Sequence, residues 1–105
     1  KHLKKLEYLQ LINNDISDIT PLKDLTNLKK LLLDINKISD VTALKSLTNL
    51  EKLSLSSNEL TDISPLKKLT KLKSLVLVGN YFLPKSEIEA LRKALPDCEI
   101  ETLDY

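Results

Sequence analysis

Three aspartates recur along the chain at intervals of 22 residues, and repeated carboxylates are the first groups that could do chemistry here. Asp18, Asp40 and Asp62 stand in segments of the same form, SDITPL, SDVTAL and TDISPL. Carboxylates held close together could bind a divalent metal or act as a general acid and base. Each aspartate, however, occurs once per unit and precedes a Thr or Ser by two residues, as a turn-stabilising residue would. We therefore expect these aspartates to stabilise turns.

The rest of the sequence offers little for catalysis. Cys98 is the only cysteine, so it cannot form an internal disulfide, and with no partner histidine available we expect a small buried hydrophobe and not a nucleophile. Gly79 is the only glycine, and no H-E-x-x-H motif, phosphate-cradling glycine loop or cysteine pair for zinc is present. We expect no enzyme, no metal and no cofactor.

Composition narrows the class of protein further. The chain of 105 residues fits one domain, 1–105, with 42% hydrophobic and 30% charged residues. The net charge of +1, with both signs interspersed, gives no basic stripe for nucleic acid. No apolar run is long enough to cross a bilayer, so we expect no membrane insertion, and the cell surface, secretion and the cytoplasm all remain open. Since methionine is absent, we read the chain as a processed protein, an excised fragment or a design.

The elements that would position any site come from an internal repeat. A shift of 22 residues aligns the repeats 3–24, 25–46, 47–68 and the incomplete 69–82. Within each unit the spacing L-x-x-L-x-L-x-x-N changes from three to two, which predicts a short strand. In the third unit, Leu53 and Leu55 then point into the core while Lys52 and Ser54 point out. The aligned leucine columns are Leu3/Leu25/Leu47/Leu69, Leu6/Leu28/Leu50/Leu72, Leu9/Leu31/Leu53/Leu75 and Leu11/Leu33/Leu55/Leu77.

One asparagine follows each predicted strand. An asparagine side chain carries both a donor and an acceptor, so it can bond the main-chain groups that a bend leaves unpaired. We expect stacked units to line these side chains up as a structural ladder of Asn14, Asn36, Asn58 and Asn80.

The segment that returns to the next strand carries helix-start signals. Thr20, Thr42 and Ser64 are predicted N-cap residues, and Pro21 and Pro65 stand at the first helical position. Few residues remain before the next unit, so a 3₁₀ turn or a single α turn is expected and not a long helix.

The two ends of the chain differ. After Asn80, Ser86 and Glu89 form a predicted capping box for an amphipathic helix that ends before Pro96, and a strand over 98–103 with Cys98 and Ile100 facing in completes a C-terminal cap, 83–105. The first repeat has no such cap. Another repeat, a capping segment or a second copy of the chain would cover its bare edge, so a homo-oligomer or missing N-terminal repeats remain open.

These repeats resemble the leucine-rich repeat family, specifically the 22-residue class of bacterial internalins and of a eukaryotic regulatory subunit of protein phosphatase. The resemblance covers residues 3 to about 82, and the C-terminal segment EIEALRKALPDCEI is similar to caps of bacterial leucine-rich-repeat proteins. It implies an α/β solenoid that is curved, with a short parallel β-sheet on the concave face and 3₁₀ or short helical turns on the convex face. It also implies a role in binding other proteins.

Outward positions of the predicted strands are the candidate binding residues. The third unit is polar, whereas aliphatic side chains occupy outward positions in the others, which indicates a protein-binding patch with Tyr8 at its edge. We predict binding through Tyr8, Gln10, Ile12, Lys30, Leu32, Asp34, Ile35, Lys52, Ser54, Val76 and Val78. Such a face covers roughly 300 Å², against about 800 Å² per partner in a standard interface, so the chain alone should bind weakly.

Two alternatives stay open. Valine and isoleucine also favour strands for conformational reasons, and some of these side chains could turn in under a neighbouring loop. The chain could then be a structural spacer or a consensus-type design belonging to a longer solenoid, self-associating through its uncapped N-terminal end. A spacer should have polar outward positions in every unit, as the third unit does.

Overall fold

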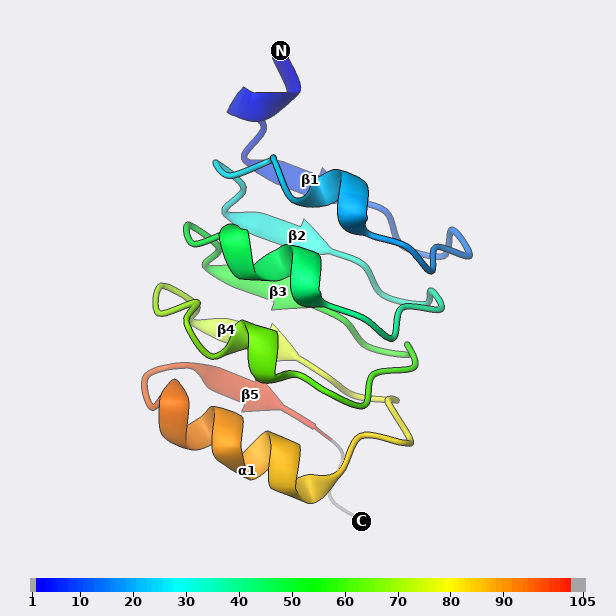
Figure 1. Cartoon of the computed structure of the whole chain (residues 1–105), viewed down its shortest axis with the longest axis vertical. Coiled ribbons are helices and arrows are strands. Elements are labelled where there is room, and N and C mark those ends of the chain that lie inside the picture. The colour runs from blue at the N-terminus through cyan, green and yellow to red at the C-terminus, as the bar shows by residue number, and fades with distance from the viewer. Residues whose placement is uncertain (1, 103–105) are drawn as a thin grey trace.

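Successive coils of the chain stack along the 43 Å long axis of the molecule (Figure 1). The computed structural model describes residues 2–102. Each coil contributes one short strand to a five-stranded parallel sheet whose strands follow one another in chain order. The strands are β1 (Tyr8–Gln10), β2 (Lys30–Leu32), β3 (Lys52–Ser54), β4 (Ser74–Val76) and β5 (Glu99–Glu101).

The register of the sheet follows the 22-residue repeat. Leu31 pairs with Leu9 on one side and with Leu53 on the other, and Leu53 pairs with Leu75. In the last pair Leu75 lies beside Ile100, so the cap strand continues the same column although its spacing differs. Because side chains alternate along a strand, outward residues also fall into columns that cross the sheet.

Short helical turns form a layer on the other side of the coils. Figure 1 shows the turns and the longer C-terminal helix lying in front of the sheet, one per coil. They are η2 (Thr20–Leu22), η3 (Thr42–Ser46), η4 (Ser64–Leu66) and α1 (Lys85–Ala94). A further turn, η1 (His2–Lys5), precedes β1 at the N-terminal end of the stack. The predicted α/β solenoid, with a parallel sheet, 3₁₀ turns and a C-terminal helix and strand, is therefore confirmed.

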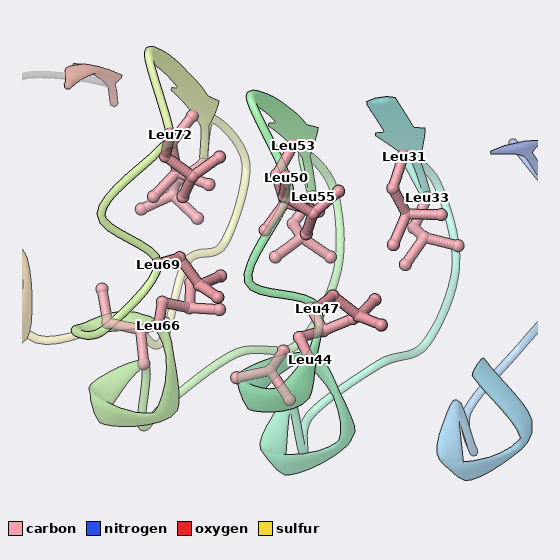
Figure 2. Packing of buried hydrophobic residues seen from close by; sticks show 14 of the residues in the cluster. Leu31, Leu33, Leu44, Leu47, Leu50, Leu53, Leu55, Leu66, Leu69 and Leu72 are labelled. Carbon is pink, nitrogen blue, oxygen red and sulfur yellow. The ribbon is translucent and has the colours of Figure 1, made fainter. Parts of the chain in front are cut away.

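The core lies between these two layers and consists mainly of leucine. In Figure 2, Leu53 and Leu55 from the strand side point toward Leu44 and Leu47 from the turn side. All four side chains are fully buried. Burying a leucine completely contributes about 1.5 to 3 kcal/mol, so these columns provide most of the stability that holds the coils together.

The predicted N-caps are wrong by one residue, because Ile19, Val41 and Ile63 occupy the N-cap positions. Thr20 begins η2, and the structure gives that turn no side-chain cap hydrogen bond. Instead, Asp18 Oδ1 accepts the backbone N–H of Thr20 at 2.9 Å. This hydrogen bond closes a short turn between the Asp18 side chain and the backbone two residues later. Thr20 therefore lies inside the 3₁₀ turn and not at its N-cap. The same correction applies to Thr42 and Ser64, whose N–H groups are accepted by Asp40 and Asp62.

The capping box predicted at Ser86 and Glu89 is also wrong. Helix α1 begins at Lys85, after Pro84 in an extended conformation, so Ser86 already lies inside the first turn and makes no cap hydrogen bond. Pro84 supplies the helix start because its fixed φ suits the N-terminal boundary. The acidic residue of that turn has another role, since Glu87 Oε1 accepts the backbone N–H of Ile63 at 3.0 Å and ties the cap to the third coil.

The fourth repeat ends where its leucine pattern ends. Phe82 occupies the place of Leu60 in the repeat, yet Phe82 is 75% exposed while Leu60 is completely buried. Leu83 packs against the core instead, because a turn joins the Leu83 N–H to the Asn80 carbonyl. The cap strand β5 is shorter than the predicted 98–103. Ile100 is buried and Cys98 half-buried, while residues 103–105 of the predicted cap lie outside the described part of the chain.

Candidate protein-binding face

The predicted binding residues all lie on β1 to β4 or within three residues after a strand. We call these outward side chains the sheet face. Strand positions carry Tyr8, Gln10, Lys30, Leu32, Lys52, Ser54 and Val76, and the segments after the strands carry Ile12, Asp34, Ile35 and Val78. On the sheet face they form columns because of the 22-residue register.

The first column is aromatic and basic. Tyr8 lies beside Lys30, and Lys30 lies beside Lys52. The Lys30 Nζ atom is 5.1 Å from the centre of the Tyr8 ring, a cation–π contact worth about 0.5 to 1 kcal/mol at an exposed site. Tyr8 remains 52% exposed, so one face of this pair is free to contact a partner.

Aliphatic side chains on the sheet face form two groups. Leu32 lies beside Gln10 and Ser54, and Ser54 separates Leu32 from Val76. Leu32, Val76 and Val78 are each half-buried. The polar third coil therefore divides the apolar surface into a part near β2 and a part near β4.

Asp34 links the second and third coils through hydrogen bonds. Its Oδ2 atom accepts the hydroxyls of Ser54 and Ser56 and, at 3.2 Å, the backbone N–H of Ser56. Ser54 is only 7% exposed as a result of this packing, although its position is outward. The carboxylate is thus fixed in place at the boundary between two coils.

Ile35 has a backbone conformation that isoleucine rarely adopts. Its φ is 59°, in the left-handed region, where a β-branched side chain is strained. The equivalent positions carry Asn13, Ser57 and Gly79, also with positive φ. Asparagine and glycine are the residues that tolerate this conformation best. At 51% exposure, Ile35 gains too little from burial to explain why isoleucine stands there.

The asparagines hold each coil to the previous one. Asn36 Oδ1 accepts the backbone N–H groups of Asn14 and Ile16, at 3.0 and 2.9 Å. Its Nδ2 donates to the carbonyl of Leu33 in its own coil and to that of Leu11 in the coil before. Asn58 and Asn80 donate to carbonyls in the same way. The side chain of Asn14, in the first coil, is exposed and donates to the Ile12 carbonyl.

The side chains first considered for catalysis or metal binding, three aspartates and one cysteine, lie in structural surroundings. Within residues 2–102, no cluster of three His, Cys, Asp or Glu side chains could hold a metal ion. The side chain and backbone N–H of Thr20 hold the pKa of Asp18 below its ordinary value, and Thr42 does the same for Asp40. The pKa of Asp62 is lowered by the backbone and side chain of Ser64. Burial raises the pKa of the Cys98 thiol, which disfavours the reactive thiolate.

Two exposed aromatic residues were missed by the sequence analysis. Tyr81 and Phe82 follow the fourth strand at the corner leading to α1, and they are 74% and 75% exposed. Their signal in the sequence is the aromatic pair at positions where the other repeats have a charged residue followed by Ile or Leu. The contact of Asp34 with Ser54 and Ser56 was also missed, because those residues are separated by 20 and 22 positions.

Comparison with known proteins agrees with this geometry. The family described as Leucine Rich repeats (2 copies) matches residues 4–46 and 48–93. No curated protein sequence matches the chain significantly. Among solved structures, an internalin (InlF) from Listeria monocytogenes is 40% identical with a TM-score of 0.87. The match covers 95% of this chain and 28% of that internalin. Internalin C2 from the same species is 33% identical with a TM-score of 0.83, covering 97% and 46%.

A more distant similarity is to a leucine-rich-repeat protein from Leptospira interrogans, which is 32% identical with a TM-score of 0.65 over 94% of this chain and 32% of that protein. The chain spans less than half the length of each of these proteins. No helix within the described residues is long and apolar enough to cross a membrane.

Stacked coils with a parallel sheet, leucine columns and an asparagine ladder define a repeat solenoid. The chain belongs to the leucine-rich repeat family, and its repeats are of the bacterial internalin type.

Proposed function

We propose that this domain is a non-catalytic protein-interaction module that binds its partner through the sheet face. Leucine-rich repeats are commonly protein-interaction modules, and solenoids of this kind offer extended surfaces for the purpose. The observation that carries the proposal is Ile35, an exposed isoleucine in a left-handed conformation. Strained residues that the fold does not require are concentrated at binding and catalytic sites.

The neighbours of Ile35 support the same conclusion. Leu32, on the same coil as Ile35, and Ile12, on the coil before, are half-buried aliphatic side chains. The cation–π pair of Tyr8 and Lys30 lies at the other edge of the sheet face. An apolar centre with a polar and charged rim is the usual arrangement of a protein interface. The small area of this face gives weak binding by the chain alone, so a longer solenoid or contacts with the loops would strengthen it.

The proposal can be tested without knowing the natural partner. A library of random peptides displayed on phage is selected on the immobilised full chain, and binding of the enriched synthetic peptides is measured by calorimetry. We expect Leu32→Glu/Ile35→Glu to abolish their binding. The matched control Thr48→Glu/Thr70→Glu adds the same two negative charges at exposed residues outside the sheet face and should leave binding unchanged. Peptides that bind both variants equally well would disprove the proposal.

The first coil supports a second proposal, that another coil of the same kind covers the N-terminal end. Leu9, Leu11 and Leu22 remain partly exposed, while their counterparts in the next coils are completely buried. A second copy of the chain could supply that coil. Sedimentation at increasing concentration should then show dimers, and Leu11→Lys should abolish them; a strict monomer at high concentration would contradict self-association.

A further inference from the structure

Asp34 is the one carboxylate among the sheet-face residues, and the third coil holds it in position. Its Oδ2 atom receives the Ser54 and Ser56 hydroxyls and the Ser56 N–H. These three donors come from two residues on and next to β3, so the carboxylate is oriented before any partner arrives. A side chain that is already ordered loses little conformational entropy on binding.

The second oxygen of this carboxylate has no protein partner. Within residues 2–102, no hydrogen bond reaches Asp34 Oδ1, and the two ion pairs of that region, Lys29 with Glu7 and Lys37 with Asp15, do not involve Asp34. The serines neutralise none of its charge, because hydroxyl and amide donors are uncharged. A negative charge with one free oxygen therefore remains on the sheet face.

The surroundings of Asp34 favour a cation with an aliphatic stem. Leu32 stands two residues earlier on the same side of the chain, and Ile35 follows directly, half exposed. Arginine and lysine pack their methylene groups against apolar surface while their charged ends remain polar. The aliphatic side chains would hold the stem, and Asp34 the charged end.

The basic column of the sheet face lies at a distance from this site. Lys30 precedes Asp34 by four residues, which is about 13 Å along an extended chain. Lys52 lies beside Lys30 and adds to the same positive edge. Along β2 and the segment after it, the charge is thus positive at Lys30 and negative at Asp34, with Leu32 between them.

We infer that the partner places an arginine or lysine on Asp34, an aliphatic side chain beside Leu32, and an acidic side chain near Lys30 and Lys52. The inference rests on the proposed function and specifies the chemistry of the partner. In an extended partner segment lying along β2, the pattern is acidic, any residue, aliphatic, any residue, basic, in either direction, because alternate side chains face the same way.

The test uses the peptides that the phage library yields against the full chain. We expect enriched peptides to share a basic residue, and Asp34→Asn to weaken their binding by about tenfold or more, since it removes the charge but keeps an oxygen for the serines. Replacing the basic residue of the peptide by glutamine should weaken binding equally, with little further loss when both changes are combined. The matched control is Asp24→Asn, an exposed aspartate on the turn side.

The outcomes separate this inference from the proposed function. Peptides that lose binding to Leu32→Glu/Ile35→Glu but bind Asp34→Asn as tightly as the original chain would overturn the inference and leave the proposed function standing. Enriched peptides without a basic residue would overturn it as well. A library that yields no peptide dependent on the sheet face would overturn both.

Discussion

Asn58 Nδ2 donates a hydrogen bond to the carbonyl oxygen of Leu33, 25 residues earlier in the chain, at 3.0 Å. The same side chain accepts the backbone N–H of Ile38 at 3.0 Å and donates to Leu55 in its own coil. One buried amide thus satisfies main-chain groups of two coils.

Replacing Asn58 by alanine should be strongly destabilising. The change leaves the Ile38 amide buried without its partner, at about 1 to 3 kcal/mol, and removes one of the two asparagine hydrogen bonds that the Leu33 carbonyl accepts. The free energy of unfolding from urea titration measures the loss. Asn14→Ala is the matched control, because the Asn14 side chain is exposed and, within residues 2–102, hydrogen-bonds with the Ile12 carbonyl alone. This change should alter stability by less than about 0.5 kcal/mol. Equal losses in the two variants would contradict the role of the ladder.

Leu53→Ala should cost about 2 to 5 kcal/mol, because Leu53 is completely buried between two neighbouring leucines of its column. Leu9→Ala is a matched change in the same column at the half-exposed first coil and should cost clearly less. Thermal unfolding of both variants measures the difference. A smaller effect at Leu53 than at Leu9 would disprove the stacking account of stability.

Ile35→Asn should stabilise the fold while weakening binding. Asparagine tolerates a positive φ better than isoleucine, and the left-handed conformation costs an ordinary residue about 1 to 2 kcal/mol. We expect the free energy of unfolding to rise by about 1 kcal/mol in urea titration. In the reverse control, Gly79→Ala should destabilise, since its new Cβ would lie 3.1 Å from the Ser57 backbone nitrogen at a φ of 84°. Loss of stability in Ile35→Asn would show that the isoleucine serves the fold.

The turn aspartates should make the fold sensitive to acid. Because the folded pKa of Asp18 lies below its ordinary value of 3.8, the folded state binds fewer protons than the unfolded state near that pH. The stabilisation is complete above pH 3.8 and is lost as the pH falls through the lowered pKa; the same sign holds for Asp40 and Asp62. The triple change to asparagine should flatten the fall of Tm below about pH 4. An unchanged pH profile would contradict this, and Asp24→Asn is the control.

The spacing of leucines was sufficient to predict the strands, the stack and the core, because burial requires apolar residues at those positions. It did not predict how the turns close. Asp18 and Thr20 are both good cap residues, and only the backbone geometry decides which side chain accepts the hydrogen bond. The capping box at Ser86 was wrong for a similar reason, since Pro84 starts the helix earlier.

The binding face was harder to predict than the fold. Its members follow from the alternation along each strand, but their conformations do not. The left-handed φ of Ile35 depends on the bend after β2, and the contact of Asp34 with Ser54 depends on how two coils pack. Phe82 points outward because the chain leaves the repeat for the cap, which a periodic pattern cannot show.

The partial exposure of the first coil gives the molecule a weak end. Within residues 2–102, β2, β3 and β4 each pair with two strands, whereas β1 pairs with β2 alone. In a one-dimensional stack, opening therefore begins where a neighbour is lacking and travels inward. Amide hydrogen exchange should be fastest around Leu11 and slow progressively toward β3, so a protease or a chaperone would engage this end first.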